Sequence, residues 1–367
     1  MAKLVYKVQR VAAGGPYDIG NVTSFVVTKG RQQVQDPYKT GTAVITGRIA
    51  STVSSLNIGD TIQIRTTTFN GSTFDNIFYV GLISDISIDY GYTSNMDTWA
   101  IQVEDGFAAA GRAVTSRTIS AGSTTYAASA AAAVGTGVSV FDALGVPSSS
   151  KTSGFSLSNA NLANVLNQLI ATEQGRFTSV GGQSILFYGR NTQNIYGTLC
   201  NFTDGTVASA LPAIKYQQIV FRSRADSYFT EVIVEPEGLA SQTAGTGDRT
   251  YTMQSYDETT SQAADLAGYV LATLTVTQGV PSSLTFLSEV QTTTEGFTAA
   301  FFGDDGTRTV TVTLRGVVYN CFIQGVTVNA DTEQTRFTIN LSSSDASAGF
   351  ILDSAVSGIL DTSKLGF

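Results

Sequence analysis

The stretch VVTKGRQQVQDPYKTGTAVITGR, residues 26–48, places two apolar, alternating segments around a polar centre. In residues 24–28 and 42–46, apolar side chains recur at every second position, which is typical of strands with one buried face. The polar centre carries four charged residues, Lys29, Arg31, Asp36 and Lys39. We therefore predict a β-hairpin whose charges are solvated, bind an anion such as nucleic acid, or meet a neighbouring protein chain.

The same period of two continues on both sides of this hairpin. Apolar residues alternate from Leu4 to Glu104, and breaks fall at Gly14-Gly15-Pro16, Asn70-Gly71 and Asp105-Gly106. These dipeptides are good turn formers, and strands of this length and spacing indicate a barrel or a sandwich. We predict a first β-barrel domain over residues 1–107.

In residues 108–212 the period-two alternation stops, and helical spacing of apolar residues appears. This pattern predicts a small α/β module. A short helix capped by Thr124 or Thr125 is expected first. A helix over about 159–174 follows, capped by Ser158 or Asn159 and ended by Gly175. Its apolar positions recur with helical spacing at Leu162, Val165, Leu166, Leu169 and Ile170.

Alternation returns in residues 213–345, which predict a second β-barrel domain. A helix over about 261–277 interrupts it, and Asp304-Asp305-Gly306 is interpreted as a turn. A three-strand meander is expected at Thr309–Leu314, Val317–Val328 and Arg336–Leu341, with a turn at 329–331. Residues 346–367 form a C-terminal tail. The predicted fold class is mainly β (a β-rich α+β fold), and the similar flanking regions hint at duplication.

Composition narrows the possible functions. The chain has a net charge of −8, and it has no histidine, which removes Ser-His-Asp triads and His-ligated metals. Cys200 and Cys321 are too few for a zinc site and are expected to be small buried apolar residues. No phosphate-binding loop or calcium-loop spacing occurs. We expect no cofactor, no bound metal, no secretory signal and no membrane span.

Carboxylates offer the remaining route to catalysis. A glycosidase needs two of them, and pairs occur at Asp85 and Asp89, at Asp257 and Glu258, and at Asp304 and Asp305. The first pair is expected on one face of a strand, where a solvated rim is the favoured interpretation. We expect no enzymatic activity.

The hairpin also resembles a known family. Its motifs are Lys29-Gly30-Arg31, Asp36, Tyr38 and Gly41-Thr42-Ala43-Val44-Ile45-Thr46. Similar pieces follow at Leu56–Asp60, Phe78–Ile86, Trp99–Asp105, Asn161–Phe177, Asp265–Leu284 and Phe350–Phe367. In this order they resemble the minor tail proteins, or baseplate hub proteins, of long-tailed bacteriophages. One departure is Ser51–Ser55, where many members carry a loop rich in Asn, Asp and Arg.

The resemblance implies two tube-type β-barrel domains that flank the α/β module. It further implies a homotrimer at the tail tip of the virion, with a ring of six barrels joining a six-fold tail tube to a three-fold tip. Implied partners are a distal tail protein or tail tube ring, the tape measure protein, and tip fibre or adhesin proteins. DNA would pass only as transient cargo.

In this setting the hairpin charges are expected to meet neighbouring subunits. The expected subunit-interface residues are Lys29, Arg31, Asp36, Tyr38, Lys39, Arg48, Leu365 and Phe367. Two alternatives stay open. The 15 tyrosines could provide stacking platforms for a host-surface glycan, and the carboxylates could serve a cell-wall hydrolase.

Overall fold

The computed structural model describes residues 4–145, 150–222, 228–275 and 279–344. Strands dominate this part of the chain, so the prediction of a mainly β fold is confirmed. Two β units flank a small α/β module, and strands of both units join in one 14-stranded sheet. No helix among the described residues has the length and apolar character that a bilayer crossing requires.

The first unit contains seven strands, beginning with β1 and ending with β7. Their bounds are β1 Leu4–Ala12, β2 Gly15–Asp18, β3 Val22–Gly30, β4 Thr42–Arg48, β5 Thr61–Phe69, β6 Ser72–Asp89 and β7 Thr98–Glu104. They lie in the order β3-β4-β7-β6-β5-β1-β2, and all neighbours are antiparallel. The hairpin of the opening stretch is therefore β3 and β4.

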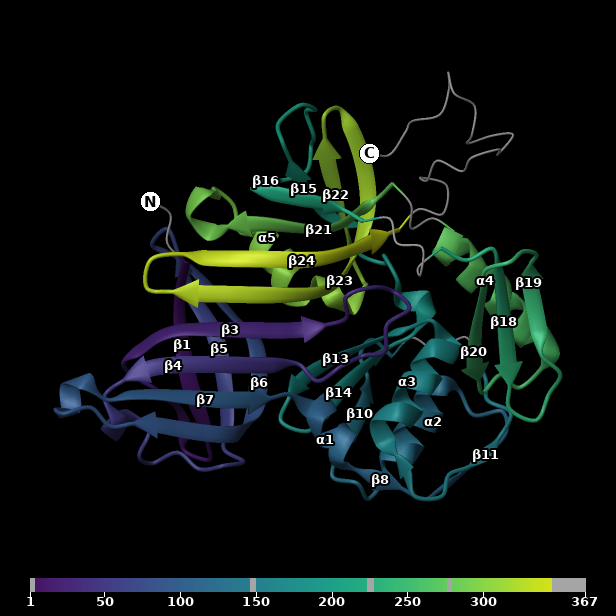
Figure 1. The fold of residues 1–367 in the computed structure, drawn as a ribbon, viewed down its shortest axis with the longest axis horizontal. Helices are drawn as coiled ribbons and strands as arrows, with labels where there is room; N and C mark the ends of the chain where they lie inside the picture. Colours follow the sequence, from purple (N-terminus) through teal and green to yellow (C-terminus); the bar gives the residue numbers. More distant parts are fainter. Residues whose placement is uncertain (1–3, 146–149, 223–227, 276–278, 345–367) are drawn as a thin grey trace.

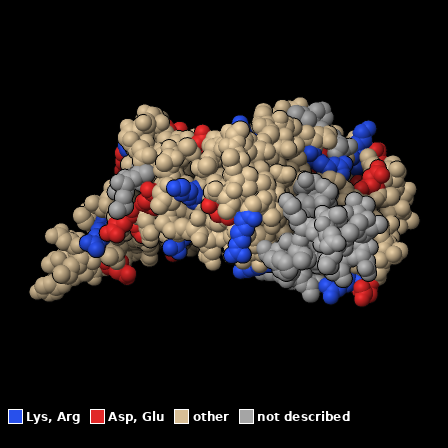
Figure 2. Space-filling model, turned by 90° about the horizontal axis from the view of Figure 1, so that it is seen from above, with Lys and Arg blue, Asp and Glu red and all other residues tan. Residues whose placement is uncertain are grey.

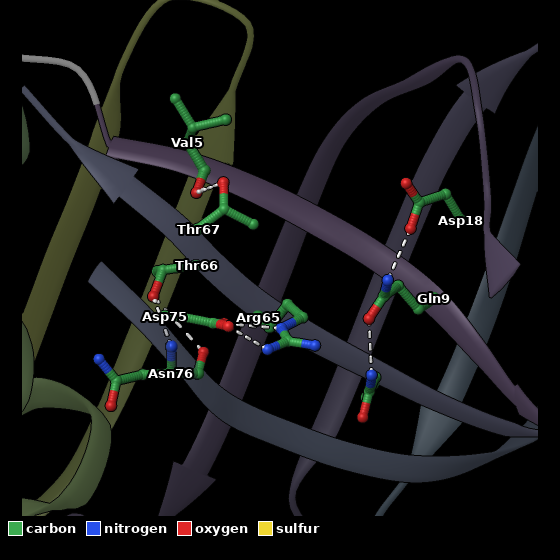
Figure 3. Close-up of polar contacts among 9 residues, drawn as sticks. Val5, Gln9, Asp18, Arg65, Thr66, Thr67, Asp75 and Asn76 are labelled. Atoms are coloured by element: carbon green, nitrogen blue, oxygen red, sulfur yellow. Dashed lines mark hydrogen bonds and ion pairs between the residues drawn. The ribbon is translucent and has the colours of Figure 1, made fainter. Parts of the chain in front are cut away.

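Polar side chains tie β1, β2, β5 and β6 together on one side of this unit (Figure 3). The Nε2 atom of Gln9 donates to Asp18 at 2.6 Å, and the Nε2 atom of Gln63 donates to the Oε1 atom of Gln9 at 2.6 Å. The Nε atom of Arg65 donates to Asp75 at 2.8 Å. Gln9 and Gln63 are buried, so these bonds supply the partners that buried amides require.

The middle module is built around α3 (Leu162–Glu173). Other elements are α1 Gly106–Arg112, β8 Val114–Thr115, β9 Thr118–Ile119, α2 Thr125–Ala133, β10 Ser139–Asp142, β11 Phe155–Ser156, β12 Ala160–Asn161, β13 Arg176–Gly181 and β14 Ser184–Tyr188. Thr124 caps α2, as predicted. The cap of α3 was predicted wrongly: Asn161 is the cap, because its side-chain oxygen accepts the N–H of Asn164 at 3.2 Å.

The second unit carries the meander expected from the sequence. Its elements are β15 Thr198–Thr203, β16 Ala213–Lys215, β17 Gln218–Phe221, β21 Pro281–Leu287, α5 Glu295–Phe302, β22 Thr309–Leu314, β23 Val317–Asp331 and β24 Thr335–Ser343. Residues 329–331 belong to β23, so the turn expected there lies further along the chain. β15 falls within the range expected for the middle module, yet it pairs with β22 and β16.

A smaller sheet is inserted between β17 and β21. It contains β18 Glu231–Pro236, β19 Gln242–Gly245 and β20 Thr250–Ser255, and α4 (Thr260–Thr275) covers it. Apolar residues of α4 and β18 form a core of their own, including Val232, Val234, Leu266 and Leu274. The inserted sheet and α4 lie at one end of the molecule (Figure 1).

The two β units repeat one topology. In chain order β3, β4, β5, β6 and β7 correspond to β17, β21, β22, β23 and β24, and both sets pair in the same spatial order. Both long strands carry a bulge against the following strand, between Ile83 and Asp85 in β6 and between Ile323 and Gly325 in β23. The duplication that the sequence only hinted at is therefore explicit in the strand order.

An antiparallel pairing of β3 with β23 joins the two units. Val26 lies opposite Asn329, and Gly30 lies opposite Gly325. As a result β21, β24, β23, β3, β4 and β7 follow one another side by side (Figure 1). The units also share one core, in which the rings of Phe78 and Phe301 stack with centroids 4.4 Å apart.

Candidate functional surface

One face of the joined sheet is covered by small polar side chains. Strand registers place on it Ser24, Val26 and Thr28 of β3; Thr42, Val44, Thr46 and Arg48 of β4; Asp85, Ser87 and Asp89 of β6; Thr98, Ala100, Gln102 and Glu104 of β7; Gln218 and Val220 of β17; Ser283, Thr285 and Leu287 of β21; Thr327, Asn329 and Asp331 of β23; and Arg336, Thr338 and Asn340 of β24. We call this set the polar face. The alternate residues of the same strands point into the core.

Hydroxyl groups on the polar face bond one another across strands. The hydroxyls of Thr28 and Thr327 are 3.3 Å apart across the β3·β23 junction. Those of Thr285 and Thr338 are 3.2 Å apart, and those of Ser24 and Thr46 are 2.7 Å apart. Such pairs stabilise neighbouring strands and leave the surface neutral.

Charge on the polar face is sparse and mixed. The cations among these positions are Arg48 and Arg336, and the carboxylates are Asp85, Asp89, Asp331 and Glu104, the last of which forms an ion pair with Arg112. Figure 2 views the molecule from above, at a right angle to the view of the sheet in Figure 1, and there too charged residues form small separate groups on a largely uncharged surface. Nucleic-acid capture requires clustered Lys and Arg that displace counterions. The charged positions named on this face do not form such a cluster.

The cations of the opening hairpin lie at the junction of the two units. The Nζ atom of Lys29 forms an ion pair with Asp304 at 3.1 Å and also donates to the carbonyl of Phe301. The side chains of Lys29 and Asp304 are only 12% and 4% exposed. The Nε atom of Arg31 donates to Gln324 at 2.8 Å. Both cations therefore bind the second unit of their own chain.

The loop between β3 and β4 also contacts the middle module. The backbone N–H of Tyr38 donates to Asn167 of α3 at 2.8 Å, and its ring meets that of Phe177 with centroids 5.9 Å apart. The guanidinium of Arg31 lies 4.8 Å from the centre of the Tyr38 ring, a cation–π distance. This loop thus connects all three parts of the chain.

Two buried charged groups complete the junction. Arg176 at the start of β13 donates to the carbonyls of Asp304 and Ile323, and burial lowers the pKa of its guanidinium. Asp105 caps α1 through a 3.0 Å bond from the N–H of Phe107. Burial raises the pKa of Asp105 to about 7, although backbone N–H groups and Lys29 act to lower it.

The residues expected at subunit interfaces divide into three groups. Lys29, Arg31 and Tyr38 are engaged within the chain, and the carboxylate of Asp36 accepts the N–H of Gln33 at 3.0 Å. Lys39 and Arg48 are exposed. Leu365 and Phe367 lie outside the described residues. An interface role for these residues stays a prediction.

Sequence reasoning missed the acceptors of the hairpin cations. Asp304 was interpreted as a turn residue, and it does lie in a short 3₁₀ segment that Gly306 ends with a φ of 74°. Its carboxylate is nevertheless buried against Lys29. In the sequence, Arg176 is only a cation at the start of a predicted strand, and nothing near it indicates which groups it contacts. Pairing across 275 positions leaves no local pattern to detect.

The other carboxylate pairs do not converge on one cleft. Asp85 and Asp89 are exposed on the polar face, whereas Asp257 is buried and accepts the hydroxyl of Ser255 at 2.7 Å. Burial raises the pKa of Asp257 to about 6. Glu258 follows Asp257 and is held by a bond from its own N–H to Gln262.

A groove of about 330 Å³ lies between the β3–β4 loop, α3 and α4. It is lined by tyrosines, which a glycan site would use for stacking. Their faces already have neighbours: Tyr251 meets Phe229 at 5.2 Å, and the guanidinium of Arg190 lies 5.1 Å from the ring centre of Tyr269. The groove therefore offers less stacking surface than its composition suggests.

Three solved structures with this fold are tail proteins, two of them from prophages. The tail protein from Neisseria meningitidis MC58 matches with a TM-score of 0.63 and 13% identity, over 93% of this chain and 97% of that one. The 43 kDa tail protein of prophage MuSo2 from Shewanella oneidensis matches with a TM-score of 0.58 and 11% identity, over 94% and 98%. Prophage tail protein gp18 from Listeria monocytogenes EGD-e matches with a TM-score of 0.51 and 12% identity, over 93% and 95%.

These likenesses extend over nearly the whole chain and confirm the resemblance at the level of the fold. The chain has the β-rich fold of these tail proteins. At the sequence level, no family model and no curated protein matches it. The likeness to these tail proteins is therefore one of fold, at 11% to 13% sequence identity.

Proposed function

We propose that the protein is a structural, non-enzymatic hub of a bacteriophage tail tip. A homotrimer of this chain joins the six-fold tail tube to the three-fold distal tip and encloses the channel through which DNA passes. Three chains with two equivalent β units each supply six units, so one ring satisfies both symmetries.

The observation that carries this proposal is the joined sheet with its polar face. Two topologically equivalent units lie edge to edge in one chain, and they present one continuous, nearly neutral surface. A ring of such units would have this surface on its inner wall. Thr, Ser and Asn hydroxyls and amides hydrate such a wall without attracting phosphates strongly.

Partners follow from a hub position. A distal tail protein or a tail tube ring would dock on one rim of the ring. The tape measure protein and tip fibre or adhesin proteins would dock on the other parts. The protein would reside in the virion, at the tail tip.

Native mass spectrometry of the purified full chain, followed by cryo-electron microscopy of intact tails, tests the proposal. We expect a trimer in solution and a three-fold ring of this chain at the tip, with the polar face toward the lumen. A tail tip without such a ring would exclude the hub role. A ring whose polar face points outward would exclude the channel role.

A further inference from the structure

The internal junction shows which strand edges of this fold pair with each other. In β23, residues Gly325–Asp331 pair with β3 on the edge that faces away from β24. In topological terms, the first strand of one unit adds to the long strand of the other. Because the units are equivalent, the same two edges exist a second time in the chain, on β17 and on β6.

Those second edges lack a strand partner in the described part of the chain. β17 pairs there with β21 alone, and residues 85–89 of β6 pair with β7 alone. Unpaired edges are templates for adding another strand. The joined sheet of each chain therefore ends in two open edges. One, on β17, is equivalent to the edge of β3, and the other, on β6, is equivalent to the edge of β23.

Burial also marks the second pair of edges as incomplete. At the internal junction Val326, Val328, Phe25 and Val27 are all at most 4% exposed. The equivalent residues Ile86 and Ile88 of β6, and Ile219 and Phe221 of β17, are only half-buried. The apolar residues are therefore in place on both open edges, but they lack the cover that the neighbouring strand gives at the junction.

We infer that β17 of one copy pairs antiparallel with β6 of the next copy, in the register of β3 with β23. This inference rests on the proposed assembly of several copies into a ring. The internal register places Val220 opposite Asp89, as Val26 lies opposite Asn329. A contact of this kind is head-to-tail, so where its rotation closes it forms a ring in which the open edges of β17 and β6 are both paired.

Charge supports the same register. If the ladder continues by two residues, Arg222 lies opposite Ser87, on the same face as Asp85 and Asp89. All three charged residues are exposed in the single chain. The guanidinium would then lie between two carboxylates of the next copy, which favours this pairing over a shifted one.

Engineered disulfides in the full chain test the register. Paired positions in an antiparallel ladder have Cα atoms about 4.5 to 5.5 Å apart, within reach of a disulfide. We expect the double variant Asp89→Cys with Val220→Cys to form intermolecular disulfides on mild oxidation. The matched control, Asp89→Cys with Ile219→Cys, moves one cysteine to the opposite face of β17 and is expected to stay unlinked. The native Cys200 and Cys321 are fully buried, so the parent chain serves as the negative control and is expected to form no intermolecular disulfide.

The outcomes separate the inference from the proposed function. Native mass spectrometry of the same samples reports whether copies assemble at all. An oligomer without the Asp89–Val220 cross-link, or with equal linking of the control, overturns the strand pairing and leaves the hub proposal standing. A monomer at all accessible concentrations overturns both.

A charge exchange provides a second, non-covalent test. We expect Arg222→Glu to raise the dissociation constant of the oligomer by about two- to five-fold, in the range of exposed ion pairs. Adding Asp85→Arg and Asp89→Arg to that variant is expected to restore most of the loss. Arg249→Glu, at an exposed position directly before β20, is the control. Equal weakening by both single variants, or no rescue, would contradict the proposed contact.

Discussion

Single residues decide how the two β units hold together. The ion pair of Lys29 with Asp304 is nearly buried and links the opening hairpin to the second unit. Removing one partner of a buried pair leaves the other charge without compensation, which costs about 3–5 kcal/mol. The junction therefore depends strongly on a lysine that the sequence presents as one of several surface cations.

Lys29→Met tests this dependence. We expect it to lower the free energy of unfolding by about 3–5 kcal/mol, because the buried carboxylate of Asp304 loses its ion-pair partner. Lys39→Met removes an exposed lysine from the same hairpin and is expected to change the free energy by less than about 0.5 kcal/mol. Denaturant titration of both variants provides the comparison, and equal midpoints would show that the buried pair does not hold the units together.

Asp105 makes the same region sensitive to pH. In the unfolded chain an Asp ionises near pH 3.9, whereas burial raises the pKa of folded Asp105 to about 7. Between these values the folded state holds a proton that the unfolded state has lost, so this residue lowers stability as pH rises from about 4 to about 7. The loss is complete above the folded pKa.

Asp105→Asn removes this titration and keeps an acceptor for the cap of α1. We expect the stability of the variant, relative to the parent chain, to increase between pH 5 and pH 8 in denaturant titrations. Asp248→Asn, at an exposed position, controls for the loss of one negative charge. A difference between D105N and the parent that is constant over this range would argue against a raised pKa.

At the scale of elements, two glycines allow β3 and β23 to approach. Gly30 has a φ of +80°, and a Cβ atom there would lie 2.4 Å from the carbonyl oxygen of Gln324. Gly325, opposite Gly30, would place a Cβ 2.6 Å from the carbonyl oxygen of Arg31. Backbone atoms cannot yield as a flexible side chain can, so the end of this strand pair requires glycine on both sides.

Gly30→Ala is expected to open this end of the junction. Gly71→Ala is a matched control, since Gly71 has a φ of +78° and open space around it. The control should lose about 1–2 kcal/mol from backbone strain alone, and Gly30→Ala should lose clearly more. Hydrogen exchange should show faster exchange of β3 and β23 amides in Gly30→Ala only. Equal effects of the two substitutions would mean that the close contact is unimportant.

Most elements could be predicted from periodicity, whereas their connections could not. The amphipathic spacing of Leu162 to Ile170 predicts α3, and alternation predicts β3, β4 and the meander. β15 was assigned to the wrong neighbours, because nothing in residues 198–203 indicates that they pair with a strand 110 positions later. The ion pair of Lys29 with Asp304 was missed for the same reason: long-range pairing depends on the folded topology.

At the scale of the whole molecule, the low net charge of the polar face can be tested by adding cations to it. A triple variant, Thr28→Lys, Thr327→Lys and Thr338→Lys, gathers three cations on neighbouring strands. We expect it to bind duplex DNA with an affinity that falls steeply with salt, since each phosphate contact releases a counterion. Phage that carry the variant should eject DNA more slowly.

The parent chain and the variant Thr28→Gln, Thr327→Gln and Thr338→Gln are the controls. They are expected to show no DNA binding by fluorescence anisotropy at 0.15 M salt. Strong DNA binding by the parent chain would contradict a lining along which DNA passes freely. Unchanged ejection with the lysine variant would show that DNA does not contact this face.

The pairing of β3 with β23 within one polypeptide has a consequence for the order of assembly. Its two halves are tethered, so they meet at a high effective concentration that does not depend on how much protein is present. The pairing of β17 with β6 between copies requires diffusional encounter and therefore depends on concentration. In a ring of six β units, half of the junctions between units would form during folding of each single chain. Only the other half would require contact between chains. Because two β units are joined in one chain, a ring of six units requires only three chains to meet.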